Sequence, residues 1–255
     1  MNEFLWVEKY RPKNIEHCIL PDDLKKTFKS FVDAGEVPNL LLCGTAGIGK
    51  TTVAKALCHE LGVDSIVING SDEGRFLDTV RNTAKQFAST VSLTSSAKHK
   101  VIIIDEADNT THDVQLLLRA SIEEFQNNCR FIFTCNFKNK IIQPLHSRTT
   151  VIDCNTRGKQ KQEIAGQFFE RCRGILNAED IQFTDAVVAE VVQKFFPDFR
   201  RTLNELQRYA ASGVIDTGIL AQISQVRLEK LVGALKSKDF GAARKWIVAN
   251  LDNDP

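Results

Sequence analysis

The feature that most limits the possible folds is a set of five short apolar runs in the first 152 residues. The runs are residues 40–43, 66–68, 101–104, 131–134 and 151–152. Each is apolar nearly throughout instead of at alternate positions, and segments with helical periodicity separate them. Strands that are apolar on both sides and are joined by helices are typical of a parallel sheet covered on both faces. We therefore expect an α/β fold built on a parallel five-stranded sheet.

The rest of the chain has a different pattern. After residue 153 the short apolar runs stop, and amphipathic segments follow at 159–172, 185–195, 199–211 and 219–235. We expect an α/β domain over residues 1–154, a small helical domain over 155–224 and the start of a further helical domain over 225–255. Residues 242–251 read as a helix face that no later segment covers, so we expect this last domain to be incomplete.

Composition narrows the class of protein. No run approaches the roughly 18 apolar residues of a membrane span, and the first residues lack the basic and apolar regions of a signal peptide. We expect a globular protein of the cytoplasm. The chain has 33 Lys and Arg against 32 Asp and Glu, a formal charge of +1. Any contact with nucleic acid therefore has to come from a local basic patch.

The seven cysteines are scattered, odd in number and without a C-x-x-C pair. This pattern argues against a disulfide framework and against a zinc site. Free cysteines behave as small apolar residues in protein cores. We expect all of them to be buried: Cys18, Cys43, Cys58, Cys129, Cys135, Cys154 and Cys172.

A glycine-rich motif follows the first apolar run. Residues 44–51 fit G-x-x-x-x-G-K-[ST] and lie between an expected strand and an expected helix, which is the context that a phosphate-binding loop requires. In such a loop the backbone N–H groups and the helix N-terminus face the phosphates, Lys50 reaches the β- and γ-phosphates, and Thr51 offers a hydroxyl to Mg²⁺. A chance glycine-rich turn is the alternative. We expect ATP and Mg²⁺ to bind here, with these residues at the nucleotide: Gly44, Thr45, Ala46, Gly47, Ile48, Gly49, Lys50, Thr51 and Thr52.

Two acidic residues follow the third apolar run. Asp105 and Glu106 come directly after residues 101–104, so they lie at the carboxyl end of a buried parallel strand, where open α/β sheets bind ligands. Asp105 is expected to hold Mg²⁺ through water, and Glu106 to orient and polarise the attacking water. Asp108 completes the tetrad D-E-A-D. The alternative is that these acids only begin the next helix, where negative charge suits the helix dipole.

Three motifs together carry a resemblance to a known family. The segment Leu5-Trp6-Val7-Glu8-Lys9-Tyr10-Arg11-Pro12, the phosphate loop and the D-E-A-D tetrad resemble the small subunits of replication factor C, and look closest to the clamp-loader large subunits of T-even-like phages. The likeness continues through residues 69–72, 115–136, 147–149 and 196–203. It implies an AAA+ ATPase domain, a helical lid and a collar domain. It also implies a cytoplasmic location, which is the host cytoplasm if the protein is viral.

The resemblance also assigns roles to single residues, each with an ordinary alternative. It places Val7, Tyr10 and Arg11 beside the adenine, although such an aromatic is more often a core residue. It makes Asn136 the amide that senses the γ-phosphate, which would otherwise be a turn residue. It makes Arg148 an arginine finger for the neighbouring subunit's ATP site, with Thr149 in place of the usual Cys, and Arg200 a lid residue that reaches the phosphates. A surface arginine is the alternative for Arg148.

The family likeness extends to other subunits and to DNA. It implies that Gln115 and Arg119, four residues apart on one helical face, lie towards the adjacent subunit and couple its ATP site; a solvated face is the alternative. For contacts with the DNA backbone, which carry no sequence readout, we expect Arg75 and Arg81, although Gly74 could occupy the family's basic position instead.

The resemblance thus implies the ATPase subunit of a clamp loader. Such a subunit works in a hetero-oligomeric spiral, expected to have five subunits, that opens a sliding clamp and loads it on primer–template DNA. Two alternatives remain open from the sequence. One is an AAA+ helicase or branch-migration motor, and the other is a scaffold subunit that binds ATP without hydrolysing it.

Overall fold

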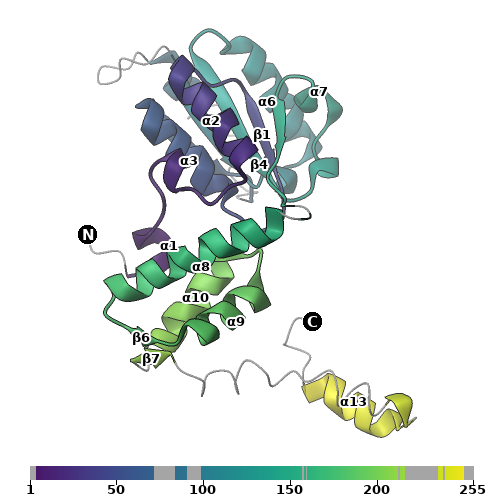
Figure 1. Ribbon diagram of the computed structural model, residues 1–255. Helices are drawn as coiled ribbons and strands as arrows, with labels where there is room; N and C mark the ends of the chain where they lie inside the picture. Colours follow the sequence, from purple (N-terminus) through teal and green to yellow (C-terminus); the bar gives the residue numbers. More distant parts are fainter. Residues whose placement is uncertain are drawn as a thin grey trace.

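A parallel sheet forms the centre of the first part of the molecule (Figure 1). The computed structural model describes residues 4–71, 84–90, 99–156, 158, 160–211, 213–215, 235–237 and 239–249. Five strands lie in the order β2-β3-β4-β1-β5, and all neighbouring pairs are parallel. They are β1 (Leu40–Cys43), β2 (Ser65–Asn69), β3 (Lys100–Asp105), β4 (Cys129–Cys135) and β5 (Thr150–Asp153). The predicted α/β fold and its five-stranded parallel sheet are confirmed.

Helices cover both faces of this sheet, which explains why its central strands β1, β3 and β4 are apolar on both sides. One face packs against η1 (Ile15–His17), α2 (Asp22–Ala34) and α3 (Lys50–Leu61); the other packs against α5 (Lys85–Ser89), α6 (His112–Glu124) and α7 (Gln143–His146). Within β1, Leu40 and Leu42 belong to the first core, whereas Leu41 and Cys43 belong to the second. Alternate residues of a strand face opposite sides, so a continuous apolar run fills two cores.

The strand order brings three strand ends together. All strands run the same way, so their carboxyl ends share one edge of the sheet, and β4 lies between β1 and β3. The chain leaves β1 into residues 44–49, β3 into Glu106 and the short helix η3 (Ala107–Asn109), and β4 into Asn136 and the short helix η4 (Lys138–Lys140). The glycine-rich loop and the acidic pair therefore meet on either side of Asn136.

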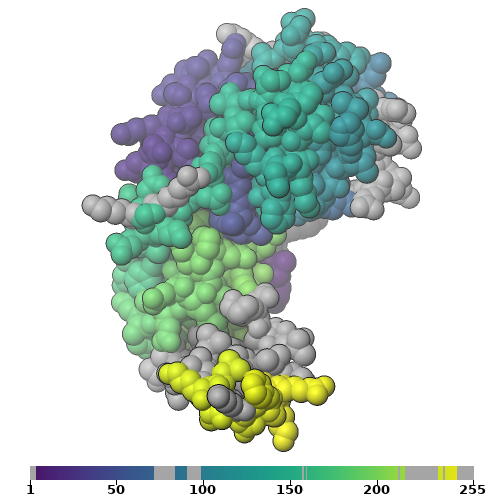
Figure 2. All heavy atoms as spheres, turned by 90° about the vertical axis from the view of Figure 1, so that its right-hand side faces the viewer, coloured from purple at the N-terminus to yellow at the C-terminus, as the bar shows by residue number. Residues whose placement is uncertain are grey.

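A helical lid follows the sheet domain. It consists of α8 (Gln160–Ala178), α9 (Asp185–Phe195) and α10 (Phe199–Ala210), with a two-stranded parallel sheet of β6 (Gln182–Phe183) and β7 (Val214–Ile215). Its core contains Phe168, Leu176, Val191 and Leu206. Figure 2 shows the lid, in green, below the sheet domain on the face that is visible there. A further helix, α13 (Phe240–Ala249), follows, and most of residues 225–255 lie outside the described residues.

The first helix belongs to the lid, although the sequence placed it in the sheet domain over residues 1–154. Helix α1 (Trp6–Lys9) packs with the lid, because Trp6 is 6% exposed within the lid core and its backbone N–H donates to Gln207 Oε1 at 3.0 Å. The lid helices offer the large apolar surroundings that an indole ring needs. The chain thus begins in the lid core before it enters the sheet domain.

The predicted burial of the cysteines is confirmed, since all seven are buried thiols. Among the described residues, no helix is both long enough and apolar enough to cross a membrane.

Candidate active site

The glycine-rich loop connects β1 to α3 and surrounds the amino group of Lys50. The Lys50 side chain is 8% exposed, and its Nζ donates to Gly44 O at 2.7 Å, to Thr45 O at 2.8 Å and to Asn136 Oδ1 at 2.9 Å. Burial lowers the pKa of Lys50 from its ordinary value, and the nearby carboxylates of Asp108 and Asp105 act in the opposite direction. The ammonium group is therefore held at the point where β1 and β4 end.

Three oxygen atoms converge beside this loop. Thr51 Oγ1 donates to Asp105 Oδ1 at 2.6 Å, and Thr134 Oγ1 donates to the same oxygen at 2.5 Å. Thr134 Oγ1 also accepts from the N–H of Glu106 at 3.0 Å, so one hydroxyl fixes both acidic residues. A hydroxyl and a carboxylate next to each other are the hard oxygen donors that Mg²⁺ prefers, so Thr51 and Asp105 fit the predicted metal.

Glu106 has an unusual backbone conformation. Its φ of 54° and ψ of 45° are left-handed, which costs a residue with a side chain about 1–2 kcal/mol. Such strain persists only where the surroundings enforce it, and here the Glu106 N–H is held by Thr134. The Glu106 carboxylate accepts from Asn109 Nδ2 at 3.1 Å and from Ser71 Oγ. The strained residue therefore turns the chain sharply at the end of β3 and is held at both its backbone and its side chain.

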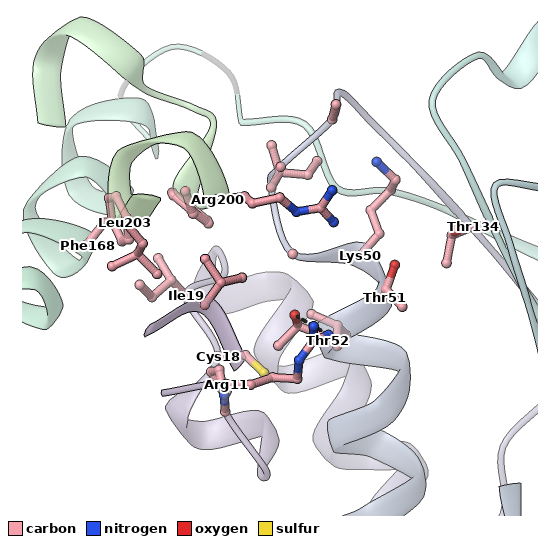
Figure 3. A pocket seen from close by; sticks show the side chains of 18 of the residues that line it. Arg11, Cys18, Ile19, Lys50, Thr51, Thr52, Thr134, Phe168, Arg200 and Leu203 are labelled. Atoms are coloured by element: carbon pink, nitrogen blue, oxygen red, sulfur yellow. Dashed lines mark hydrogen bonds between the residues drawn. The ribbon is translucent and has the colours of Figure 1, made fainter. Parts of the chain in front are cut away.

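One cavity joins these residues to the lid. Figure 3 shows Lys50, Thr51 and Thr134 on one side and Arg200, Leu203 and Phe168 reaching in from the lid helices. The cavity is lined by predicted residues from every part of the site: Val7, Tyr10, Arg11, Ala46, Gly47, Ile48, Gly49, Lys50, Thr51, Thr52, Asp105, Glu106, Asn136 and Arg200. Gly44 and Thr45 adjoin it through the carbonyl groups that bind Lys50.

The N-terminal segment also lines the cavity, through Val7, Tyr10 and Arg11. Arg11 Nη1 donates to Thr52 Oγ1 at 3.5 Å, and its Nε donates to Glu8 Oε2 at 3.0 Å. This contact with Arg11 holds the pKa of Glu8 below its usual range, against the effect of burial. The Tyr10 hydroxyl donates to Glu179 Oε1 at 2.6 Å, so its ring is tied to the residue that follows α8.

Sequence reasoning missed several lining residues. Lid residues on the inner surface include Phe168, Arg171, Ile175, Phe199 and Leu203. In the sequence the four apolar ones fit the apolar stripe of an amphipathic helix, which predicts burial but not a cavity, and Arg171 reads as a surface cation. Thr134 was missed as well, and the only available signal was its position near the end of an apolar strand.

The loop also touches the lid directly. The Phe199 N–H donates to Gly47 O at 3.1 Å, and Asp198, the N-cap of α10, accepts from the Arg201 N–H at 2.9 Å. In the linker after β5, Asn155 Oδ1 accepts from the Thr45 N–H at 3.0 Å. The loop is thereby tied to both the linker and the first turn of the helix that carries Arg200.

Arg148 lies apart from the cavity of its own chain. Its Nε donates to Glu123 Oε1 at 2.9 Å, its Nη1 donates to Pro144 O at 2.9 Å, and 32% of its side chain is exposed. The contact with Arg148 holds the pKa of Glu123 below its ordinary value. The guanidinium is therefore at the surface, fixed to α6.

Gln115 does not have the exposed position that the sequence suggested. It is 2% exposed, its Nε2 donates to Lys140 O at 3.1 Å, and its Oε1 accepts from the Ile142 N–H at 2.9 Å. The polar backbone of the turn after η4 has to be satisfied once it is buried, and this amide does so. Arg119 Nε is buried, with no hydrogen-bond partner among the described residues. Arg75 and Arg81 lie outside the described residues.

Comparison with known proteins identifies related chains. Residues 40–155 match the model of the ATPase family associated with various cellular activities (AAA), and residues 160–221 match that of the sliding-clamp-loader large subunit, AAA+ ATPase lid domain. Among solved structures, RuvB of Thermotoga maritima has a TM-score of 0.65 at 23% identity, covering 85% of this chain and 72% of RuvB. At that identity the likeness shows the AAA+ fold alone.

Curated relatives are more similar in sequence. The chain is 39% identical to the sliding-clamp-loader large subunit of Enterobacteria phage T4, over 98% of this chain and 82% of the relative. It is 40% identical to that of Escherichia phage RB69, over 95% and 76%, and 34% identical to a replication factor C small subunit of Thermofilum pendens, over 93% and 73%. The chain therefore belongs to the clamp-loader family of AAA+ ATPases, which includes these phage large subunits and the replication factor C small subunits.

Proposed function

We propose that this chain is the ATPase subunit of a DNA polymerase clamp loader, which uses ATP to open a sliding clamp and to load it on primer–template DNA. The observation that carries this proposal is the meeting of three strand ends in one cavity. There Lys50 Nζ lies 2.9 Å from Asn136 Oδ1, and Thr51 Oγ1 lies 2.6 Å from Asp105 Oδ1. The sliding clamp as a partner is inferred from the names of the related clamp-loader subunits, and DNA is our proposal.

The cavity suits ATP at both of its ends. The triphosphate would lie along the loop of residues 44–49, where backbone N–H groups, the N-terminus of α3 and Lys50 supply positive charge. The adenine would lie towards Val7, Tyr10 and Arg11, which also line the cavity. Magnesium, when bound, neutralises charge that develops on the phosphate oxygens. Thr51 and Asp105 would hold it, with Thr134 fixing the orientation of the carboxylate.

Hydrolysis would depend on Glu106 as the residue that orients the attacking water and accepts its proton. Asn136 would place that water and contact the γ-phosphate. Arg200 would approach from the lid and stabilise the charge of the transition state, so that closing the lid completes the site.

A neighbouring subunit would supply the last cation. Arg148 does not line the cavity of its own chain but lies at the surface, where Glu123 and Pro144 hold it. An arginine inserted from another subunit is worth about 10³–10⁵-fold in turnover. We propose that Arg148 acts there, with Arg119 and the buried amide of Gln115 linking the two sites inside a five-subunit spiral.

Contacts with DNA would be made to the phosphate backbone without sequence readout. With a net charge of +1, the chain as a whole attracts DNA weakly, so a few basic residues have to provide the contact. Arg75 and Arg81 remain our candidates. DNA bound inside the spiral would then stimulate hydrolysis and release both the clamp and the DNA.

The test is ATP turnover by the complete assembly, measured with and without primed DNA plus the clamp. We expect turnover to be slow with ATP alone and to rise when both partners are present. The variant Glu106→Gln should bind ATP normally and lose turnover by about 10²–10⁴-fold, the usual contribution of a general base.

Equal rates with and without the partners would contradict the loader proposal. A strand-displacement assay separates it from a helicase or branch-migration motor, which would unwind duplex DNA. A single-turnover measurement separates it from a scaffold subunit, which would bind ATP and leave it intact.

A further inference from the structure

The last acid of the D-E-A-D tetrad has a contact that neither metal binding nor water activation uses. Asp108 is 5% exposed, although it follows the strand end in the short helix η3. Its Oδ2 accepts from the N–H of Asn136 at 3.2 Å and from the N–H of Phe137 at 3.0 Å. One carboxylate oxygen thus binds two successive backbone groups at the end of β4.

This contact holds the residue proposed to contact the γ-phosphate. Asn136 is the first residue after β4, so no strand partner fixes its backbone beyond Cys135. The Asn136 side chain accepts from Lys50 Nζ at 2.9 Å. The Asn136 backbone N–H donates to Asp108 Oδ2, which takes the place of a strand partner. A carboxylate that accepts backbone N–H groups makes hydrogen bonds about twice as strong as neutral ones.

The shape of the chain after β3 explains how Asp108 reaches this position. The left-handed conformation of Glu106 turns the chain at once into η3. Within that turn, Asn109 Nδ2 lies 3.1 Å from the Glu106 carboxylate, whereas Asp108 points to the end of β4. The strained turn therefore allows neighbouring residues to hold Glu106 and Asn136 separately.

The other oxygen of Asp108, Oδ1, bears on whether Asp108 acts through its position or through its charge. Asp108 Oδ1 is buried and has no hydrogen-bond partner among the described residues. A buried oxygen without a partner costs about 1–3 kcal/mol. The carboxylate therefore gains its hydrogen bonds through Oδ2 alone, and a carboxamide could present the same oxygen there.

We propose that Asp108 is a positioning residue for ATP hydrolysis, which sets the backbone of Asn136 through Oδ2 and thereby places the Asn136 amide at the γ-phosphate. The proposal rests on the proposed ATPase function and deepens it. Displacement of a catalytic group by about 1 Å can lower the rate about 10²-fold. Asp108 would thus act on turnover through Asn136 and leave nucleotide binding nearly unchanged.

Three substitutions separate position from charge. Asp108→Asn keeps an oxygen at Oδ2 and removes the charge, Asp108→Glu keeps the charge and moves the oxygen, and Asp108→Ala removes both. We expect the Asn variant to keep kcat within about 3-fold of the unmodified chain, and the Glu and Ala variants to lose about 10- to 100-fold in kcat. The affinity for ATP, from equilibrium titration, should change less than about 3-fold in all of them.

A double-mutant cycle tests whether the effect passes through Asn136. In an Asn136→Ala background, Asp108→Glu and Asp108→Ala should lower kcat by less than about 2-fold, because the group that they displace is already missing. Asp113→Ala is the matched control, since Asp113 is an exposed acid in the first turn of α6. It should leave kcat unchanged.

The outcomes are distinct. An active Glu variant with an inactive Asn variant would show that charge matters instead of position, and an equal loss with and without Asn136 would show that Asp108 acts elsewhere; either result overturns the proposal. If the Ala variant does not fold, the Asn and Glu variants make the same comparison. Absence of turnover in the unmodified assembly would instead contradict the proposed function itself.

Discussion

Gly47 lies where the phosphate loop meets the lid. Its φ is +77°, and a Cβ atom built on it would lie 1.8 Å from Asp198 Oδ1. Its carbonyl oxygen accepts from the Phe199 N–H at 3.1 Å. A side chain at this position would therefore meet both an unfavourable backbone conformation and the first turn of α10.

We expect Gly47→Ala to lower the free energy of unfolding by about 1–2 kcal/mol for the left-handed backbone, with about 1–3 kcal/mol more for the overpacked contact. Because the lid would be pushed from the loop, the affinity for ATP should fall as well. Urea unfolding and ATP titration measure the two effects.

Gly166→Ala is the control for this substitution. Gly166 lies inside α8, and nothing is within 4 Å of a Cβ atom built there. This change should raise the free energy of unfolding by about 0.5–1 kcal/mol, since glycine weakens a helix interior. If Gly47→Ala proved as harmless as Gly166→Ala, the described contact between loop and lid would be wrong.

At this scale the sequence predicts residues whose chemistry depends on spacing along the chain. Lys50, Thr51 and Asp105 follow directly from motifs next to apolar strands. The roles of Thr134 and Asp108 could not be predicted, because their partners are determined by which strand ends become neighbours in the folded sheet. Gln115 was expected at a surface, whereas the turn after η4 covers it.

Among the elements, α3 both extends the phosphate loop and packs on the sheet. It begins at Lys50, and its residues Val53, Ala54 and Leu57 lie in the core on one face of the sheet. Cys58 on the same helix is 1% exposed, and burial raises the pKa of its thiol to about 12. The Cys58 thiol therefore reports how firmly α3 is docked.

We expect the stability of the fold to decrease in alkaline solution, in part through Cys58. The unfolded thiol loses its proton near pH 9, whereas the folded thiol keeps it until the pH approaches 12. The contribution of this thiol to the free energy of unfolding is thus fully present below pH 9 and is lost as the pH rises from 9 towards 12. Urea midpoints at pH 7.5 and pH 10 should show the decrease, and Cys58→Ala should make it smaller; an unchanged pH dependence in that variant would contradict the docking of α3.

The elements themselves were largely predictable. Each of the five apolar runs lies in a strand, and the pattern is clearest in the central strands β1, β3 and β4, because a buried parallel strand has no polar face to interrupt it. The order β2-β3-β4-β1-β5 was not predictable from these runs, which are equally apolar and contain no information on their neighbours. Helix α1 was placed with the sheet domain, although Trp6 finds its apolar surroundings in the lid.

For the whole molecule, the cavity depends on both parts of the chain. The phosphate loop comes from the sheet domain, Arg200 and Phe168 come from the lid, and Tyr10 comes from the segment that joins the lid core at the start of the chain. Movement of the lid would change both ends of the site together. This arrangement suits an ATPase in which the bound nucleotide sets the position of the lid and thereby affects neighbouring subunits.

The central claim is that the cavity holds the phosphates of Mg²⁺-ATP at Lys50. Equilibrium titration with ATP in the presence of Mg²⁺ tests it directly, with Lys50→Ala compared to Lys55→Ala on the same helix. The account predicts that Lys50→Ala weakens binding by about 10- to 100-fold, the loss of a hydrogen bond to a charged group, and that Lys55→Ala binds as the unmodified chain does. Equal affinities of the two variants would contradict it.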